Sequence, residues 1–319
     1  MQVVRLTAGQ AEAEVWTLGA ALNRLVVPGP AGPVPVLLGV RDQAARLASK
    51  AYLGEIVGPY GNRIAEGRFT LDGVEHRLEQ NFAGRHCLHS GSDGFHRREW
   101  TVLEQTLDQA RLGLVWSDTT GDHPGPVRAE VTYWLGEQWL EYQTEVRASA
   151  ATVVNVTAHP YFNLAGGGTV HEHRLQVRAE RYLPVSETLI PLPEAPAPVS
   201  GPLDLRRPQR LAASTTSGGL DHCFVLDGEG FREVATLTAP SGLQMTISTD
   251  LPGLQVYTGH GLDQTTVGPD GPYQPYAGVA LETQHFPDAP NRPDFPSTVL
   301  RPGEVRRSRT RWVLTVGGV

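Results

Sequence analysis

The sequence predicts an all-β protein built as a large antiparallel sandwich, and three observations lead to that fold class. Apolar and polar residues alternate with a period of two along most of the chain, as in strands that bury one face. Turn-forming Gly and Pro, 35 and 25 of the 319 residues, separate these alternating runs. A helical pattern is confined to residues 42–49. Many short strands with turns between them are typical of sandwiches.

The strand-like runs extend over nearly the whole chain. Two hairpins stand out, because each pairs alternating runs across a short polar connection. Residues 69–78 carry Asp72-Gly73, a dipeptide suited to the positive φ angles of a tight turn. Residues 127–135 and 140–148 form a longer hairpin around 136–138. The other expected strands are 12–17, 21–26, 98–106, 110–117, 151–158, 173–179, 233–239, 243–249, 253–258, 278–284 and 309–316.

One stretch departs from this rhythm. Residues 184–208 contain seven prolines, whose fixed φ and missing N–H predict a long irregular connection. Its composition is not that of a flexible linker, and the chain shows no internal repeat. We therefore expect residues 1–319 to form a single domain.

Charge and composition exclude several classes of protein. The formal net charge is −7 and no Lys/Arg block occurs, so nucleic acid is not an expected partner. No apolar run is long enough to cross a bilayer, and the first residues lack a signal-peptide pattern, so we expect a cytoplasmic protein without a membrane partner. Two cysteines are too few for a disulfide framework. The sequence leaves monomer and homodimer open.

Glu282 is the first candidate for chemistry. It lies in the middle of the apolar strand 278–284, on the face opposite Val279 and Leu281 and shared with Gln284. A carboxylate in that position is costly to desolvate unless it is paired or lines a wet cleft. A structural ion pair and a functional site both explain it.

His159 is the second candidate. Alternation along 151–158 and into residue 159 places His159 on one face with Asn155 and Thr157. Pro160 favours an extended conformation at His159 and ends the strand, which places the imidazole at a sheet edge. A hydrogen-bonded structural histidine is the competing interpretation.

The remaining polar clusters are weaker. His86 and His89, or His171 and His173, could begin a metal site, but neither pair has a third ligand at recognisable spacing, so we expect no metal. No Gly-x-Gly-x-x-Gly or phosphate loop is present, so no nucleotide cofactor is expected. A Ser/His/Asp triad stays open on spacing alone, although no Gly-x-Ser-x-Gly elbow occurs.

Four segments together resemble the ordered signatures of the aldose 1-epimerases, also called galactose mutarotases. They are Gly58-Pro-Tyr-Gly-Asn-Arg-Ile64, Leu88-His-Ser-Gly-Ser-Asp-Gly-Phe95, Asn155-Val-Thr-Ala-His-Pro-Tyr-Phe-Asn-Leu164 and Leu281-Glu-Thr-Gln-His-Phe-Pro-Asp-Ala289. Asp221-His222 and Gly253-Leu-Gln-Val-Tyr-Thr258 also fall where the family has matching segments. The resemblance extends from about residue 20 to the C-terminus.

The resemblance implies an antiparallel β-supersandwich of the galactose mutarotase type, with an aldose sugar lying across an open sheet and no metal or organic cofactor. It implies Glu282 as general base and His159 as general acid. The implied sugar-binding residues are Asn62, Arg63, His89, Asp221 and Gln255.

An aromatic platform and two departures complete the expectations. Phe286, close after Glu282, is the candidate to cover the apolar face of the sugar, and a core position is its alternative. The family usually has Gly-Arg and Leu-His-Gly-Gly where this chain has Pro59 and Ser90, which puts the sugar preference in doubt. Three alternative functions stay open: a hexose-6-phosphate 1-epimerase, a sugar-binding protein without turnover, and a two-carboxylate glycosidase that would use Asp221.

Overall fold

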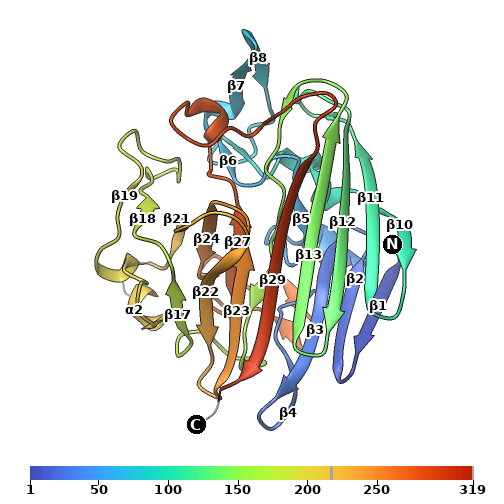
Figure 1. The fold of residues 1–319 in the computed structure, drawn as a ribbon, viewed down its shortest axis with the longest axis vertical. Coiled ribbons are helices and arrows are strands. Elements are labelled where there is room, and N and C mark those ends of the chain that lie inside the picture. Colours follow the sequence, from blue (N-terminus) through green and yellow to red (C-terminus); the bar gives the residue numbers. More distant parts are fainter. Residues whose placement is uncertain (216–217, 318–319) are drawn as a thin grey trace.

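The computed structural model describes residues 1–215 and 218–317, and its strands form three larger antiparallel sheets (Figure 1). The nine-stranded sheet has the spatial order β10 (Thr101–Gln105), β11 (Gln109–Trp116), β12 (Val127–Gly136), β13 (Trp139–Ala148), β29 (Arg306–Val316), β23 (Leu243–Thr249), β22 (Arg232–Thr238), β17 (Arg174–Val177) and β20 (Gln209–Arg210).

Two further sheets and several short ladders complete the architecture. The six-stranded sheet has the order β16 (Tyr161–Phe162), β27 (Val279–Gln284), β24 (Gly253–Tyr257), β21 (Asp221–Val225), β18 (Arg181–Leu183) and β19 (Ala197–Pro198). The four-stranded sheet consists of β1 (Val3–Ala8), β2 (Ala11–Trp16), β3 (Ala21–Gly29) and β4 (Gly32–Pro35). The two-stranded ladders are β5 (Ile56–Val57) with β15 (Thr157–Ala158), β6 (Arg63–Ile64) with β9 (Cys87–Leu88), β7 (Arg68–Leu71) with β8 (Val74–Arg77), β14 (Thr152–Val153) with β28 (Val299–Leu300), and β25 (Val267–Gly268) with β26 (Gly271–Pro272).

The main core lies between the nine-stranded sheet and the two smaller sheets. On β12, Val131 and Tyr133 are buried, whereas Thr132 between them is half-buried. The same hydrophobic cluster contains Leu25 of β3, Leu254 of β24 and Leu281 of β27. The predicted sandwich is therefore confirmed, with alternation along each strand dividing core from surface.

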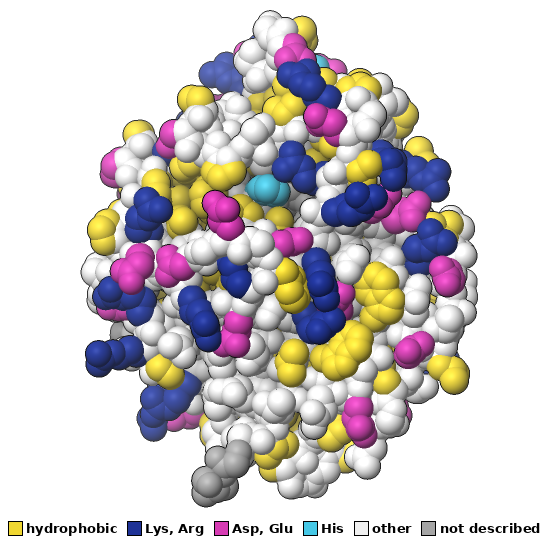
Figure 2. All heavy atoms as spheres, viewed as in Figure 1, with side chains coloured by type: hydrophobic (Ala, Val, Ile, Leu, Met, Phe, Trp, Pro, Cys, Tyr) yellow, Lys and Arg dark blue, Asp and Glu magenta, His cyan; other side chains and the backbone are white. Residues whose placement is uncertain are grey.

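The outer face of the nine-stranded sheet is charged but balanced. Positive and negative side chains are interspersed over the face of the molecule in Figure 2. Glu141 of β13 accepts from Arg311 of β29 at 2.7 Å, and the Arg311 guanidinium lies over the ring of Trp139. Such cross-strand pairs stabilise neighbouring strands of a sheet modestly.

Both predicted hairpins and the short helix are present. In the β7–β8 turn, Asp72 and Gly73 have φ angles of 50° and 81°, as the tight turn requires. Helix α1 (Gln43–Ala48) begins after Asp42, whose carboxylate accepts from the Ala45 N–H at 2.8 Å. A second short helix, α2 (Ala212–Thr215), was not predicted. No helix among the described residues is long and apolar enough to span a membrane.

The expected continuous strand over 151–158 is wrong. The chain pairs as β14, leaves that ladder, and pairs again as β15 with a different partner. Between the two, the Val154 and Asn155 N–H groups donate to the carbonyls of Thr298 and Pro59. Tertiary hydrogen bonds from two loops therefore override the local alternation, and His159 follows a short two-stranded ladder.

The proline-rich stretch 184–208 is largely irregular, as expected, although it contains β19 and one short 3-10 turn, Gly201–Leu203. Several strands were not predicted, among them β1, β18 and β21. Of these β21 matters most, because it begins at Asp221.

Candidate active site

The six-stranded sheet presents three of the expected site residues on one face. The register of β27 with β24 places Glu282 opposite Gln255, and the register of β24 with β21 places Tyr257 opposite Asp221. Gln255 and Tyr257 are two residues apart on one strand and so share a face. Leu281 faces the core instead, as the alternation in this strand predicts.

His159 lies against Glu282 and is held through its main chain. The His159 N–H donates to the Glu55 carbonyl at 2.9 Å, and the Gly54 N–H donates to the His159 carbonyl at 2.9 Å. Its Nε2 is 3.4 Å from Oε1 of Glu282, and its ring stacks on Tyr161 with a centroid distance of 5.2 Å. That separation is too long for a strong charge-assisted hydrogen bond, so both groups keep bonding capacity.

Asn62 and His89 come from two turns beside the sheet. Both residues have left-handed backbones, with φ angles of 65° and 53°. The Asn62 N–H donates to Nδ1 of His89 at 3.0 Å. Because Nδ1 accepts a hydrogen bond, Nε2 of the neutral ring must carry the hydrogen, and His89 offers the cleft a donor. Strained conformations of this kind cluster at functional sites.

Arg63 and Asp221 form the far side of the site. Nη2 of Arg63 is 3.1 Å from Oδ2 of Asp221, and the guanidinium lies over the Phe82 ring at 4.5 Å. Nε2 of Gln255 donates to Oδ1 of Asp221 at 2.5 Å. The carboxylate thus orients both an arginine and an amide.

The structure brings all seven sequence-predicted site residues to one cleft of about 330 Å³. Polar atoms in its walls are left with unused bonding capacity. Within residues 1–215 and 218–317, Oε2 of Glu282, Oε1 of Gln255 and Nε of Arg63 are buried without a hydrogen-bond partner. Buried polar groups are normally paired, so these atoms point to a ligand rich in donors and acceptors.

The electrostatics of the central pair differ from a simple attraction model. That model predicts a raised pKa for His159, because Glu282 would favour the imidazolium in a wet cleft. Instead, burial lowers the pKa of His159 to about 4 and raises the pKa of Glu282 well above its ordinary value. The expectation is wrong because the two side chains lie on the cleft floor, 5% and 2% exposed. Loss of hydration disfavours both charges there.

The proposed role of Phe286 as the sugar platform is also wrong. Its ring packs against Phe295 in a separate hydrophobic cluster and is absent from the cleft walls. The chain turns after β27, where the His285 N–H donates to the Asn155 side chain, so strand alternation no longer applies. The aromatic residues that do line the cleft are Tyr52, Phe82, Tyr161 and Tyr257.

The histidine pairs weighed as metal ligands serve other contacts. Nδ1 of His86 accepts from the Glu66 N–H, and Nε2 of His173 accepts from the Leu164 N–H, both at 3.0 Å. One different cluster, His89, His159 and Glu282, has ligand atoms within 4.8 Å of one another. The His89 tautomer opposes metal binding, because a ligating nitrogen must offer a lone pair where His89 carries its hydrogen.

The two departures from the family pattern meet in one turn outside the cleft. Oγ of Ser90 accepts from the Tyr60 N–H at 2.8 Å, and Tyr60 follows Pro59 directly. Among the described residues, neither Pro59 nor Ser90 lines the cleft. Their contacts support the turn that leads into Asn62.

An antiparallel β-sandwich with a buried contact between Glu282 and His159 in a polar-lined cleft suits the class of enzymes that act on small, hydroxyl-rich molecules. Comparison with known proteins agrees. The aldose 1-epimerase family model matches residues 2–312. Galactose mutarotase from Sus scrofa is 37% identical over 98% of this chain and 93% of its own, and aldose 1-epimerase from Escherichia coli K12 is 33% identical over 92% and 89%.

A solved structure shows the same fold. The GalM/aldose epimerase homologue from C. elegans superposes with a TM-score of 0.94 at 25% identity, covering 99% of both chains. The chain belongs to the aldose 1-epimerase family.

Proposed function

We propose that this protein is an aldose 1-epimerase, an isomerase that interconverts the α and β anomers of free aldoses such as glucose or galactose. Membership of the family supports the activity. The observation that carries the chemistry is the contact of Glu282 with His159, 3.4 Å apart in a cleft lined with polar groups.

The reaction needs a base and an acid at two oxygens bonded to the same carbon. Glu282 takes the proton of the C1 hydroxyl while His159 gives a proton to the ring oxygen, the bond between C1 and the ring oxygen breaks, and the open aldehyde forms. Rotation about C1–C2 presents the other carbonyl face. The ring then closes with both proton transfers reversed. Acid–base groups placed in this way contribute roughly 10²–10⁴-fold each.

Burial of the pair has a consequence for the proton. In the free site the lowered pKa of His159 and the raised pKa of Glu282 favour one proton on the carboxyl and a neutral imidazole. A bound sugar donates its C1 hydroxyl to Glu282 and offers its ring oxygen to His159. Both hydrogen bonds favour the charged forms, so the substrate itself promotes the productive proton arrangement.

The remaining cleft residues hold the sugar. His89 presents an N–H donor, and Arg63, Asp221 and Gln255 form one bonded set that accepts and donates to hydroxyls. We assign Asn62 to the same binding role, because its Oδ1 accepts from the Arg63 backbone N–H at 2.9 Å and from Nη1 of the Arg63 guanidinium at 3.3 Å. These contacts act on substrate and transition state alike and set binding more than rate.

The cleft charges favour a free sugar over a hexose 6-phosphate. Among the described lining residues, the basic side chains are those of Lys50 and Arg63 apart from the histidines, and they share the cleft with the carboxylates of Asp221 and Asp263. A phosphate site would concentrate cations. Both carboxylate oxygens of Asp221 contact protein groups, Oδ2 the Arg63 guanidinium and Oδ1 the Gln255 amide. These contacts argue against Asp221 as the second catalytic carboxylate of a glycosidase.

Polarimetry tests the proposed activity. Freshly dissolved α-D-glucose and α-D-galactose should reach rotational equilibrium faster with protein than without it. If the protein accelerates the approach to equilibrium for neither of these sugars, nor for arabinose or xylose, the proposal is wrong. Stronger competition by glucose 6-phosphate than by glucose would favour the phosphorylated substrate, and release of reducing sugar from a glycoside would favour the glycosidase.

A further inference from the structure

A short segment behind His159, residues 49–57, forms one wall of the site. The main chain of Gly54 and Glu55 makes both hydrogen bonds to the His159 backbone. Tyr52 has a left-handed backbone with φ of 56° and lines the cleft. Its ring contacts the rings of His89 and His159 at centroid distances of 4.6 and 5.8 Å. The position of His159 therefore depends on how this segment is held.

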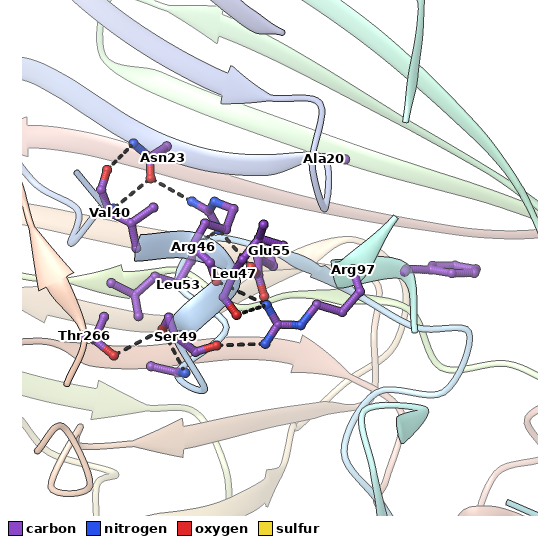
Figure 3. Close-up of polar contacts among 12 residues, drawn as sticks. Ala20, Asn23, Val40, Arg46, Leu47, Ser49, Leu53, Glu55, Arg97 and Thr266 are labelled. Carbon is purple, nitrogen blue, oxygen red and sulfur yellow. Dashed lines mark hydrogen bonds and ion pairs between the residues drawn. The ribbon is translucent and has the colours of Figure 1, made fainter. Parts of the chain in front are cut away.

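One buried guanidinium holds it. Arg46 of α1 is 1% exposed and donates through Nη1 to Oε1 of Glu55 at 3.0 Å and to the Leu53 carbonyl at 2.9 Å (Figure 3). Its Nη2 donates to Oδ1 of Asn23 at 2.7 Å. Glu55 itself is 3% exposed. The planar fork of an arginine thus fixes the segment relative to α1 and β3 at once.

A second arginine extends the network toward the cleft. Arg97 donates to the carbonyls of Arg46, Leu47 and Ser49, which satisfies carbonyls at the C-terminal end of α1 (Figure 3). The Ser49 hydroxyl lies 3.1 Å from that of Thr266, a lining residue of the cleft. The two loops on this side of the site are therefore attached to the same helix end.

Stability alone is a weak reason for this ion pair. Removing two charges from water costs as much as their attraction returns, and apolar side chains of similar volume often stabilise a core as well. Burial raises the pKa of Glu55, and the Arg46 guanidinium opposes that shift. What apolar side chains could not supply is directional anchoring of the segment that carries Tyr52 and contacts His159.

We propose that Arg46 and Glu55 are positioning residues for the reaction, which fix the His159 backbone and the Tyr52 ring against Glu282. This inference rests on the proposed function. Neither Arg46 nor Glu55 lines the cleft. The two side chains act through the main chain of Gly54 and Glu55 and through the ring of Tyr52. Loss of the pair should lower kcat more than it raises KM, because Arg63, Asp221 and Gln255 bond to one another and keep those contacts.

Two variants separate geometry from stability. Arg46→Met combined with Glu55→Leu removes both charges and the hydrogen bonds between the two side chains. We expect this double variant to fold with a Tm close to that of wild type but with kcat lower by about tenfold or more. Misplacement of a catalytic group by about 1 Å can cost about 10²-fold in rate. Glu55→Gln keeps an acceptor for Nη1 of Arg46 but leaves the arginine uncompensated. We expect it to lose Tm and keep kcat within about threefold of wild type, since the anchor survives.

Glu141→Gln is the matched control, because Glu141 is a buried, ion-paired carboxylate on β13 that is absent from the cleft walls. Its Tm should fall with kcat unchanged. Polarimetry at varied galactose gives kcat and KM, and thermal unfolding gives Tm.

A folded double variant with wild-type kcat would overturn the proposal. If the double variant does not fold, Arg46→Lys takes its place. Lysine keeps the positive charge but lacks the planar guanidinium that donates to three acceptors at once. Wild-type kcat in Arg46→Lys would also overturn the proposal. Wild-type protein without mutarotation would instead overturn the proposed function, so the two failures are distinguishable.

Discussion

At the scale of single residues, the chemistry depends on two groups whose charges are disfavoured by burial. Glu282 and His159 contact each other at 3.4 Å on the floor of the cleft. Together they hold one transferable proton over the range between the lowered pKa of the imidazole and the raised pKa of the carboxyl. Such a pair titrates as a unit with two apparent pKa values. Addition of a second proton removes the base, and loss of the first removes the acid.

The pH profile of kcat/KM should therefore have a broad plateau. We expect the acidic limb near pH 4, where His159 takes up the second proton, and the alkaline limb well above the ordinary glutamate pKa, where Glu282 loses the first. In His159→Asn the limb near pH 4 should be absent, because asparagine does not titrate, and the residual activity should instead fall at a higher pH, where Glu282 takes up its proton. An acidic limb that persists unchanged near pH 4 in this variant would remove His159 from the pair.

At the scale of elements, the site is assembled from edges and turns around one regular surface. Strand β27 and its neighbours β24 and β21 place Glu282, Gln255 and Asp221 by register alone. His159, Asn62 and His89 are held instead by loops that bond to one another. Alternation along the sequence is therefore enough to orient Glu282, whereas it gives the wrong strand before His159. Closeness in sequence to Glu282 likewise gives the wrong place for the ring of Phe286.

Gly54 illustrates the role of the loops. It has φ of 69°, and an added Cβ would lie 2.1 Å from the Leu22 carbonyl oxygen. We expect Gly54→Ala to destabilise the fold by more than about 1 kcal/mol, through its left-handed backbone and the clash. It should also lower kcat, because the Gly54 N–H anchors the His159 carbonyl. Urea unfolding and polarimetry measure the two effects.

Gly73→Ala provides the comparison. Gly73 is also left-handed, with φ of 81°, but no atom lies within 4 Å of an added Cβ. It sits in the β7–β8 turn, away from the cleft, so about 1 kcal/mol of stability should be lost with activity intact. Equal losses of kcat in both variants would mean that the Gly54 contact has no special role.

At the scale of the whole molecule, burial makes the fold sensitive to acid. Burial lowers the pKa of nine of the 11 histidines: well below its ordinary value for His89, to about 3 for His96, and to about 4 for His123, His159, His173 and His285, with smaller shifts for His86, His222 and His260. Below about pH 6.5 these histidines bind protons in the unfolded chain but stay neutral in the folded chain. Their stabilising contribution is therefore complete above pH 6.5 and is lost as the pH falls toward 4.

We predict that the free energy of unfolding falls between pH 7 and pH 5, by about 1.4 kcal/mol per pH unit for each extra proton that the unfolded state binds. The buried carboxyls Glu55, Glu282 and Asp288, and the exposed Asp250, have raised pKa values and oppose this trend, but the histidines outnumber them. Urea unfolding at the two pH values measures the slope. His123→Gln should flatten it, and equal stability at both pH values would contradict the account.

The sequence predicted more of the site than of the environment that surrounds it. Four ordered motifs led to Asn62, Arg63, His89, His159 and Glu282, and two shorter segments led to Asp221 and Gln255. All seven residues meet in one cleft, because each segment belongs to an element with a defined register or turn. The sequence did not reveal Tyr52, whose place depends on a left-handed backbone, or the Arg46–Glu55 contact across α1 and the adjoining loop. Attraction between the two side chains alone gives the wrong direction for the His159 pKa for the same reason, since burial is a property of the assembled fold.

The most direct test of the central claim is the rate of α-D-galactose mutarotation with Glu282→Gln beside wild type. The amide keeps the shape of the side chain but cannot take the C1 hydroxyl proton, so we expect the rate to fall by at least about 10²-fold. The variant should remain folded, and at alkaline pH no less stable than wild type, because it no longer buries an ionisable carboxyl. A folded Glu282→Gln protein with activity within about tenfold of wild type would show that Glu282 is not the base.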